Sequence, residues 1–158
     1  MDMDAILEKV TGIFAGLENG PASPDTGALI EKATTIAKVL VIAGPVIMLI
    51  LGLLYLFAAP REANHHFGYR CYFGMGSEQA WRFTQRIAGM TWIALGSILT
   101  VAMLIVTGRF PGQDVLEMLT TASTCVVVEA LVLLIATLVI RITVAAVFDR
   151  HGERRRRK

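Results

Sequence analysis

Three long apolar segments dominate the pattern of hydrophobic and polar positions along the chain. They cover about residues 37–59, 87–107 and 119–140, and each reaches the roughly 20 predominantly apolar residues that a helix needs to cross a bilayer. Inside lipid a span must satisfy its own backbone hydrogen bonds, so isolated apolar runs of this length are helical. The pattern predicts an all-α fold, a three-span transmembrane helical bundle.

A weaker pattern precedes the first span. In residues 1–18 apolar side chains recur at three- and four-residue steps, which predicts an amphipathic helix. We expect this helix at the outer surface, docked on the bundle, because its acidic polar face is not attracted to anionic lipid. Residues 19–35 then form a linker and the start of the first helix, residues 36–148 the membrane domain, and residues 149–158 a basic cytoplasmic tail.

Local signals extend the second and third helices beyond their apolar parts. Ser77 is a good N-cap residue and Glu78 favours the first turn, so the second helix is expected to begin about two turns before Ile87. The third helix is expected to continue past Arg141 to Phe148. The connection between the first two spans, residues 60–86, therefore combines a loop with the start of a helix.

The composition agrees with a membrane protein. The chain is 54% hydrophobic and 18% charged, whereas a soluble domain carries about a quarter charged residues. Cys71 and Cys125 are poor disulfide partners, because Cys125 lies within the third span and Cys71 in a loop that we place in the cytoplasm, where thiols stay reduced. The start of the chain lacks the basic and continuous apolar regions of a signal peptide.

The distribution of charge predicts the orientation in the membrane. Residues 1–36 and the connection between the second and third spans are acidic, whereas residues 60–86 and the segment from 141 to the C-terminus are basic. Basic residues next to span ends stay in the cytoplasm. We therefore expect a multi-pass protein of the bacterial inner membrane with its N-terminus outside and its C-terminus in the cytoplasm. The arginine-rich tail is expected to set topology beside anionic lipid rather than to bind nucleic acid.

Glu129 is the one charged residue of the third span. It lies about 15 Å along the axis from either end of that span, so its side chain cannot easily reach water. Three roles stay open: a protonated hydrogen-bond donor to Ser97 or Thr100 of the second span, a lining residue of a polar ligand or ion cavity, or part of a dimer interface. On the first span, Gly44 and Gly52 favour close approach of a neighbouring helix.

The loop between the first two spans is the main candidate for a binding site. Loops as long as residues 61–76 are usually either functional or disordered. Four aromatic residues and three glycines in this loop argue against disorder. They are Phe67, Gly68, Tyr69, Tyr72, Phe73, Gly74 and Gly76. Arg70, Arg82 and Arg86 are expected either to converge on an anion such as a lipid phosphate, or to act as interfacial anchors that set topology.

The same region carries a recognisable motif. It comprises Asn64-His65-His66-Phe67-Gly68-Tyr69-Arg70, then Ser77-Glu78-Gln79-Ala80-Trp81, then Arg86 and Gly89, and it resembles the SdpI family of bacterial membrane proteins. The resemblance covers about residues 51–106 and, more loosely, the third span. It implies that the family's characteristic loop is formed by Asn64, Gly68, Tyr69, Arg70, Ser77, Glu78 and Trp81. Two features of the chain depart from the family's pattern. Cys71 stands where the family usually has Thr, and the chain is a three-span unit rather than the longer immunity protein for which the family is named.

Other constellations are weaker. His65, His66 and Cys71 match no standard metal spacing, so we predict no metal site and no cofactor. A Cys71 nucleophile with a histidine base would need a third, orienting group and a substrate pocket. A non-enzymatic role is therefore favoured.

The resemblance implies an immunity or signalling protein that recognises a membrane-active peptide or a lipid ligand. The residues expected to bind the ligand or a partner are Asn64, Gly68, Tyr69, Arg70, Ser77, Glu78, Trp81, Arg82, Arg86 and Glu129. The alternatives are a membrane enzyme or carrier acting on a lipid-linked phosphate, and an accessory subunit of a larger membrane complex. The expected partners are the lipid bilayer, a peptide toxin or lipid-phosphate ligand, and further copies of the chain or other subunits.

Overall fold

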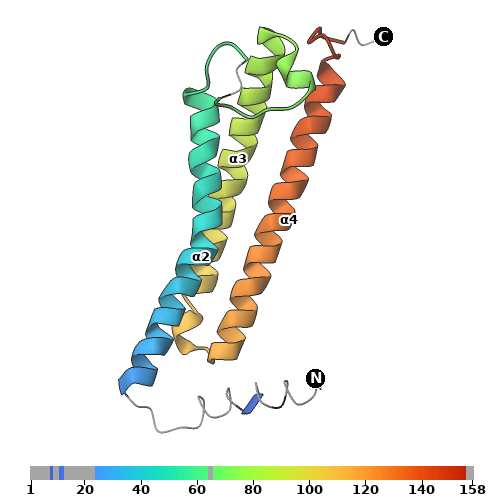
Figure 1. Ribbon diagram of the computed structural model, residues 1–158. Coiled ribbons are helices and arrows are strands. Elements are labelled where there is room, and N and C mark those ends of the chain that lie inside the picture. Colours follow the sequence, from blue (N-terminus) through green and yellow to red (C-terminus); the bar gives the residue numbers. More distant parts are fainter. Residues whose placement is uncertain (1–7, 9–10, 13–23, 64–65, 156–158) are drawn as a thin grey trace. The chain divides into compact units, whose positions relative to one another are not determined.

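The computed structural model describes residues 8, 11–12, 24–63 and 66–155. This part of the chain contains three α-helices, which are α2 (Pro24–Phe57), α3 (Glu78–Thr107) and α4 (Val115–Val147), and two short 3-10 helices, η1 (Phe73–Met75) and η2 (Phe110–Gly112) (Figure 1). Among the described residues there is no strand beyond one isolated bridge between Phe148 and Arg154. The all-α prediction is confirmed. The predicted amphipathic helix over residues 1–18 lies almost entirely outside the described residues.

All three helices are long and apolar enough to cross a membrane. Only 11% of the most apolar part of α4 is buried within the protein, and large side chains such as Ile98, Ile135 and Ile142 are more than half exposed. In water such continuous apolar surface would be unstable, whereas in a bilayer it faces acyl chains. The chain is therefore a multi-pass membrane protein.

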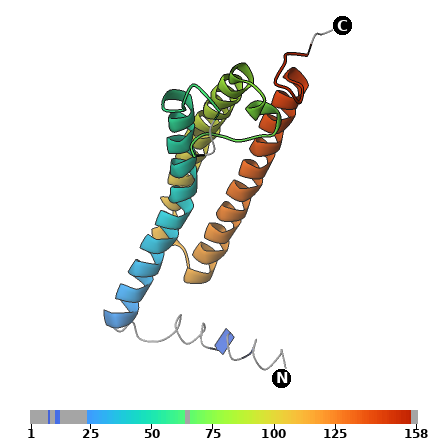
Figure 2. The same cartoon turned by 45° about the horizontal axis from the view of Figure 1, so that its top comes forward.

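The chain divides into two compact units, residues 1–36 and 37–158. In the first unit, the described part of α2 is an exposed helix in which the Thr34 and Thr35 hydroxyls donate to the carbonyls of Ile30 and Glu31. In the second unit, the rest of α2 lies beside α3 and α4 (Figures 1 and 2). The described parts of the loop, residues 58–63 and 66–77, cover one end of these helices, and η2 connects α3 to α4 at the other end.

Helices α2 and α3 approach each other through glycines. A Cβ atom added at Gly89 would lie 2.9 Å from the carbonyl oxygen of Gly52, and one added at Gly96 would lie 2.8 Å from the backbone nitrogen of Leu49. Side chains at these positions would force the two backbones apart. The close approach expected at Gly52 is confirmed, and its partner surface on α3 is formed by Gly89 and Gly96.

The predicted ends of α3 and α4 are also found. Ser77 has extended backbone angles and its hydroxyl accepts from the backbone N–H of Ala80, which satisfies one of the unpaired donors of the first turn. Helix α4 runs on to Val147, with Phe148 as its C-cap. As a result, both helices extend past the apolar segments on the side of the loop and provide the surface on which the loop packs.

Candidate functional site

A buried side chain of α3 holds the loop in place. The backbone N–H of Tyr69 donates to Gln85 Oε1, and Gln85 Nε2 donates to the carbonyl of Tyr69, both at 2.8 Å. A carboxamide presents a donor and an acceptor side by side, as a neighbouring β-strand does, so one residue satisfies both backbone groups of a loop residue that is only 8% exposed. Gln85 thereby fixes the position of Tyr69.

Trp81 supports the loop one turn earlier on the same face of α3. It is fully buried, and its indole Nε1 donates to the carbonyl of Pro60 at 2.8 Å. Gly68 lies against its ring with φ +119°, a conformation that favours glycine, and a Cβ atom there would come within 2.6 Å of Trp81 Cζ2. The motif residues Gly68 and Trp81 therefore shape the loop, and their contact with a ligand or partner stays a prediction.

The Tyr69 side chain connects all three helices of the second unit. Its ring contacts Tyr55 of α2 and Trp92 of α3, with centroids 6.2 and 6.1 Å away. Its hydroxyl donates to the carbonyl of Thr137 on α4 at 3.3 Å and accepts a hydrogen bond from Arg141. Burial raises the pKa of the phenol above its ordinary value, and the bond from Arg141 opposes this rise.

The start of α3 is also tied to the end of the chain. The Ser77 hydroxyl donates to the carbonyl of Gly152 at 2.8 Å, and a Cβ at Gly76 would lie 2.6 Å from the Gly152 nitrogen. Residues 149–155 fold back in a turn closed by Asp149, whose Oδ1 accepts from the backbone N–H groups of His151 and Glu153 at 2.9 Å. The Glu153 N–H in particular holds the pKa of the Asp149 carboxyl below its ordinary value. This part of the segment predicted as a tail is thus a folded element.

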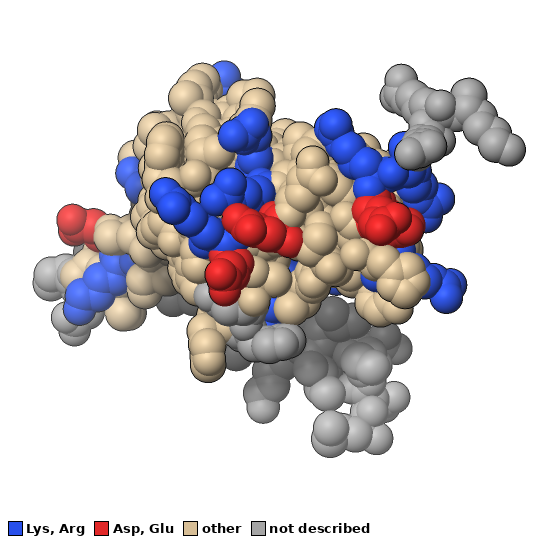
Figure 3. All heavy atoms as spheres, turned by 90° about the horizontal axis from the view of Figure 1, so that it is seen from above, with Lys and Arg blue, Asp and Glu red and all other residues tan. Residues whose placement is uncertain are grey.

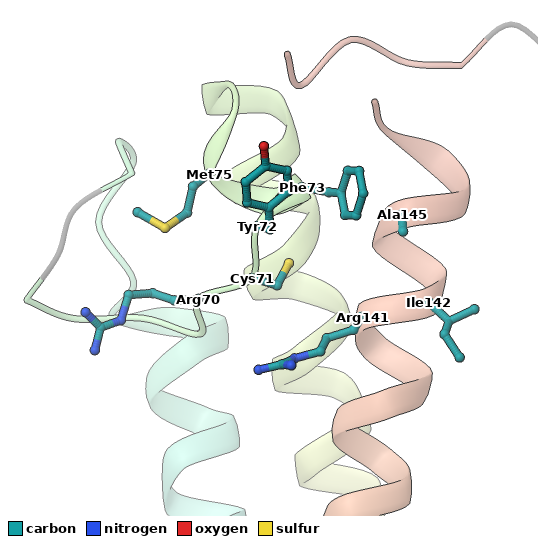
Figure 4. Close-up of a pocket in the computed structure, with 8 residues that line it drawn as sticks. All are labelled: Arg70, Cys71, Tyr72, Phe73, Met75, Arg141, Ile142 and Ala145. Carbon is teal, nitrogen blue, oxygen red and sulfur yellow. The ribbon is translucent and has the colours of Figure 1, made fainter. Parts of the chain in front are cut away.

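A pocket of about 540 Å³ lies between the loop and α4. Figure 4 shows Arg141 extending from α4 toward the loop that carries Arg70. The other lining residues are mostly apolar: Cys71, Tyr72, Phe73, Met75, Ile142 and Ala145. The lining therefore combines the Arg141 guanidinium with an apolar wall and contains no carboxylate or imidazole, while the Arg70 side chain at its edge points away from Arg141 (Figure 4).

Arg82 and Arg86, which were expected to join Arg70, do not line this pocket. Arg82 pairs with Glu78 at 3.2 Å, one turn away along an exposed ridge of α3 that continues to Arg86. This ridge is distinct from the buried face that carries Trp81 and Gln85, as helical periodicity requires. The cation that joins Arg70 is instead Arg141, which the sequence marked only as a charge that sets topology.

Seen from the loop side, the end of the bundle is rich in basic groups (Figure 3). Basic side chains spread around this face, with acidic clusters among them. The described charged residues of the loop, the start of α3 and the C-terminal part are Arg61, Glu62, Arg70, Glu78, Arg82, Arg86, Arg141, Asp149, Arg150, Glu153, Arg154 and Arg155. Arginine predominates, so this end attracts anions.

The predicted site residues fall into separate groups. Gly68, Tyr69, Ser77 and Trp81 build the frame of the loop; Arg70 lines the pocket; Glu78, Arg82 and Arg86 form the exposed ridge. Asn64 lies outside the described residues. Gln85, Arg141 and Gly152 were missed. The position of Gln85 on the buried face of α3, one turn after Trp81, was the available signal for the first of them.

Glu129 lies on α4 within the bundle, away from the loop. A Cβ at Gly44 would lie 2.5 Å from Glu129 Oε2, so the carboxyl group fills the space that the glycine leaves on α2. Its Oε1 is buried without a hydrogen-bond partner among the described residues. In the part of the chain that the structure describes, no hydrogen bond joins Glu129 to Ser97 or Thr100, and the Thr100 hydroxyl donates to the carbonyl of Gly96 at 2.6 Å. The expected bond to α3 is therefore not made, and the cavity and dimer roles stay predictions.

The described residues contain no group of three His, Cys, Asp or Glu side chains arranged to hold a metal ion. Both cysteines are free and buried. Cys71 lines the pocket, but no described carboxylate or histidine lines it beside the sulfur. The arrangement can bind an anion with an apolar part, and its lining offers no base for catalysis.

The SdpI/YfhL protein family model matches residues 61–145, which include the loop, α3 and most of α4. No curated protein and no solved structure was found to match the chain. The family match covers more than half of the sequence and all described residues of the loop motif, from Gly68 to Trp81. The chain therefore belongs to the SdpI/YfhL protein family.

Proposed function

We propose that this protein is a non-enzymatic immunity or signalling protein of the bacterial inner membrane that recognises a membrane-active peptide or lipid ligand. The observation that carries the proposal is the pocket between the loop and α4, in which Arg70 and Arg141 border an apolar wall. A ligand that partitions into a membrane and carries an anionic group matches both features.

The rigidity of the loop supports recognition rather than a passive connection. Gln85, Trp81 and Ser77 each bind backbone groups of segments that are distant along the chain, so the loop is pre-organised before a ligand arrives. The enzyme alternative would need a base or nucleophile activated within the pocket, and the carboxylate of Glu78 is instead exposed and paired with Arg82.

The orientation that the charge pattern predicts has this pocket on the cytoplasmic side. Single cysteines test it in a variant that lacks Cys71 and Cys125. Gly112→Cys, in the turn between α3 and α4, should react with a membrane-impermeant maleimide in intact cells. Arg150→Cys, beyond α4, should react only after the cells are permeabilised. The reverse pattern would overturn the orientation and with it the cytoplasmic site.

Survival of a toxin-sensitive bacterium exposed to a secreted sporulation-delaying peptide tests the immunity role. Cells that carry the wild-type chain should survive, and cells that carry Arg70→Ala should die although the protein is equally abundant in the membrane. Arg61→Ala is the matched control, because Arg61 is an exposed arginine of the same loop that does not line the pocket. Death of cells with abundant wild-type protein would contradict immunity against this class of peptide.

A further inference from the structure

The pocket lies at the depth where lipid phosphates are found. In α4 the charged residues Glu117 and Arg141 mark the two ends of the mainly apolar membrane part, about 36 Å apart at about 1.5 Å per residue. The hydrocarbon core of a bilayer is about 30 Å thick, with the headgroups directly outside it. Arg141 therefore stands at the boundary, and the last turns of α4 continue among the headgroups.

The Arg141 guanidinium is anchored but keeps donors for a ligand. It donates to the hydroxyl of Tyr69, which itself donates to the Thr137 carbonyl. A guanidinium has further N–H groups in a planar fork that matches the oxygens of a phosphate. Among the described residues Arg141 forms no ion pair, so none of the described carboxylates competes for these donors.

The apolar side of the pocket continues into the membrane part of α4. Ile142 lines the pocket, and Leu138 and Ile135 follow it at helical spacing toward the middle of the span. All three are 48–66% exposed, which gives a continuous apolar stripe below the cationic mouth. A molecule with a phosphate at the level of Arg141 would lay its acyl chain along this stripe.

From these positions we infer that the pocket is a binding site for an anionic phospholipid, whose phosphate is held by Arg141 with Arg70 at the rim. A zwitterionic lipid carries the same phosphate but adds a choline cation, which the Arg141 guanidinium and the basic character of this end of the bundle disfavour. The inference deepens the proposed function by naming a ligand, and it rests on that function only in treating this pocket as a ligand site.

Lipid retention measures the preference directly. The full chain is purified in a mild detergent, supplied with an equimolar mixture of phosphatidylglycerol and phosphatidylcholine, and examined by native mass spectrometry. Wild-type protein should retain phosphatidylglycerol over phosphatidylcholine by on the order of tenfold, because only the choline cation of phosphatidylcholine is repelled by the basic mouth of the pocket. Arg141→Gln should lose this preference.

Arg82→Gln is the matched control, because it removes the same charge from the exposed ridge and should keep the preference. Arg141→Lys retains the charge but not the fork, and an intermediate preference in this variant would show that loss in Arg141→Gln is not due to misfolding. Equal retention of both lipids by the wild type, or a preference that survives in Arg141→Gln, would overturn the inference. Displacement of the lipid by millimolar inorganic phosphate would assign the site to free phosphate instead.

The test of the lipid site and the test of the immunity role have distinguishable outcomes. Lipid retention is measured without any peptide, whereas survival is measured with the peptide in cells. A lost lipid preference with intact protection would leave the proposed function standing, and a retained lipid preference without protection would leave the lipid site standing.

Discussion

Replacement of Gln85 by Leu should release the loop from α3. The substitution keeps most of the side-chain volume but removes both hydrogen bonds to the Tyr69 backbone, each 2.8 Å long. An unsatisfied buried backbone group costs about 1–3 kcal/mol, and here a donor and an acceptor are left together. Because the loop can open and expose both groups to water, we expect the free energy of local opening to fall by about 1.5–3 kcal/mol.

Cys71 provides the assay, since it lies two residues after Tyr69 and is only 8% exposed. In a Cys125→Ala background it is the single thiol, and its reaction with a maleimide follows the population of the open loop when opening and closing are fast. A change of about 1.5–3 kcal/mol corresponds to a rise in labelling rate on the order of 10- to 100-fold. The rate is measured on protein in detergent or in nanodiscs.

Gln79→Leu is the control, because Gln79 is exposed one turn and a half earlier on the same helix. It introduces the same change of side chain without touching the loop, so Cys71 should keep the wild-type labelling rate. If Gln85→Leu also labels at the wild-type rate, the two hydrogen bonds do not hold the loop. If both variants label faster, the effect belongs to α3 as a whole.

Three further changes test the frame around the loop. Gly68→Ala places a Cβ 2.6 Å from Trp81 at φ +119°, and should lower stability by about 1–3 kcal/mol, measured as a reduced Tm in detergent. Ser77→Ala removes the N-cap bond of α3 and the bond to Gly152, and should lower the same Tm through a loss of about 1–2 kcal/mol. The pKa of Asp149 is depressed in the folded state. Its contribution to the stability of the turn is therefore present above the ordinary pKa and is lost as pH falls through the lower folded value. The turn over residues 149–155 should loosen in that acid range, and amide hydrogen exchange detects the change.

Each of these changes has a control of the same chemical type. Gly112→Ala meets nothing within 4 Å and should leave Tm unchanged. Ser123→Ala removes an exposed hydroxyl within α4 and should cost little compared with Ser77→Ala. Asp149→Asn keeps a side-chain acceptor that does not titrate, so acid should no longer loosen the turn. A turn that loosens equally in the wild type and in Asp149→Asn would assign the effect to other groups.

The sequence predicted the features that depend on near neighbours along the chain. The hydrophobic runs predicted three helices long enough to cross a membrane, and Ser77 marked the start of α3 because an N-cap bonds within its own first turn. The extension of α4 to Phe148 followed in the same way from local pattern. The combined motif from Gly68 to Trp81 identified the family, which the match over residues 61–145 confirms.

The roles of individual motif residues were harder to predict, because a motif does not say which side chains are buried. Tyr69 and Trp81 were expected to contact a ligand or partner; both are buried, and that contact stays a prediction. Gln85 was not singled out, although it makes the two hydrogen bonds that fix Tyr69. A polar residue on a helix is a loop anchor only if the loop returns to it, and helix periodicity contains no information on that return.

The sequence by itself determined the number of spans, the helix ends and the basic character of one end of the bundle, since each follows from local hydrophobicity, capping and charge. Only the tertiary structure decided that Arg141 rather than Arg82 joins Arg70 at a pocket, and that Gly152 returns to Ser77. These pairs are 71 and 75 residues apart. Contacts at such separations depend on how the three helices pack and where the loop folds back, and packing is set by the complementarity of whole surfaces rather than by any local run of residues.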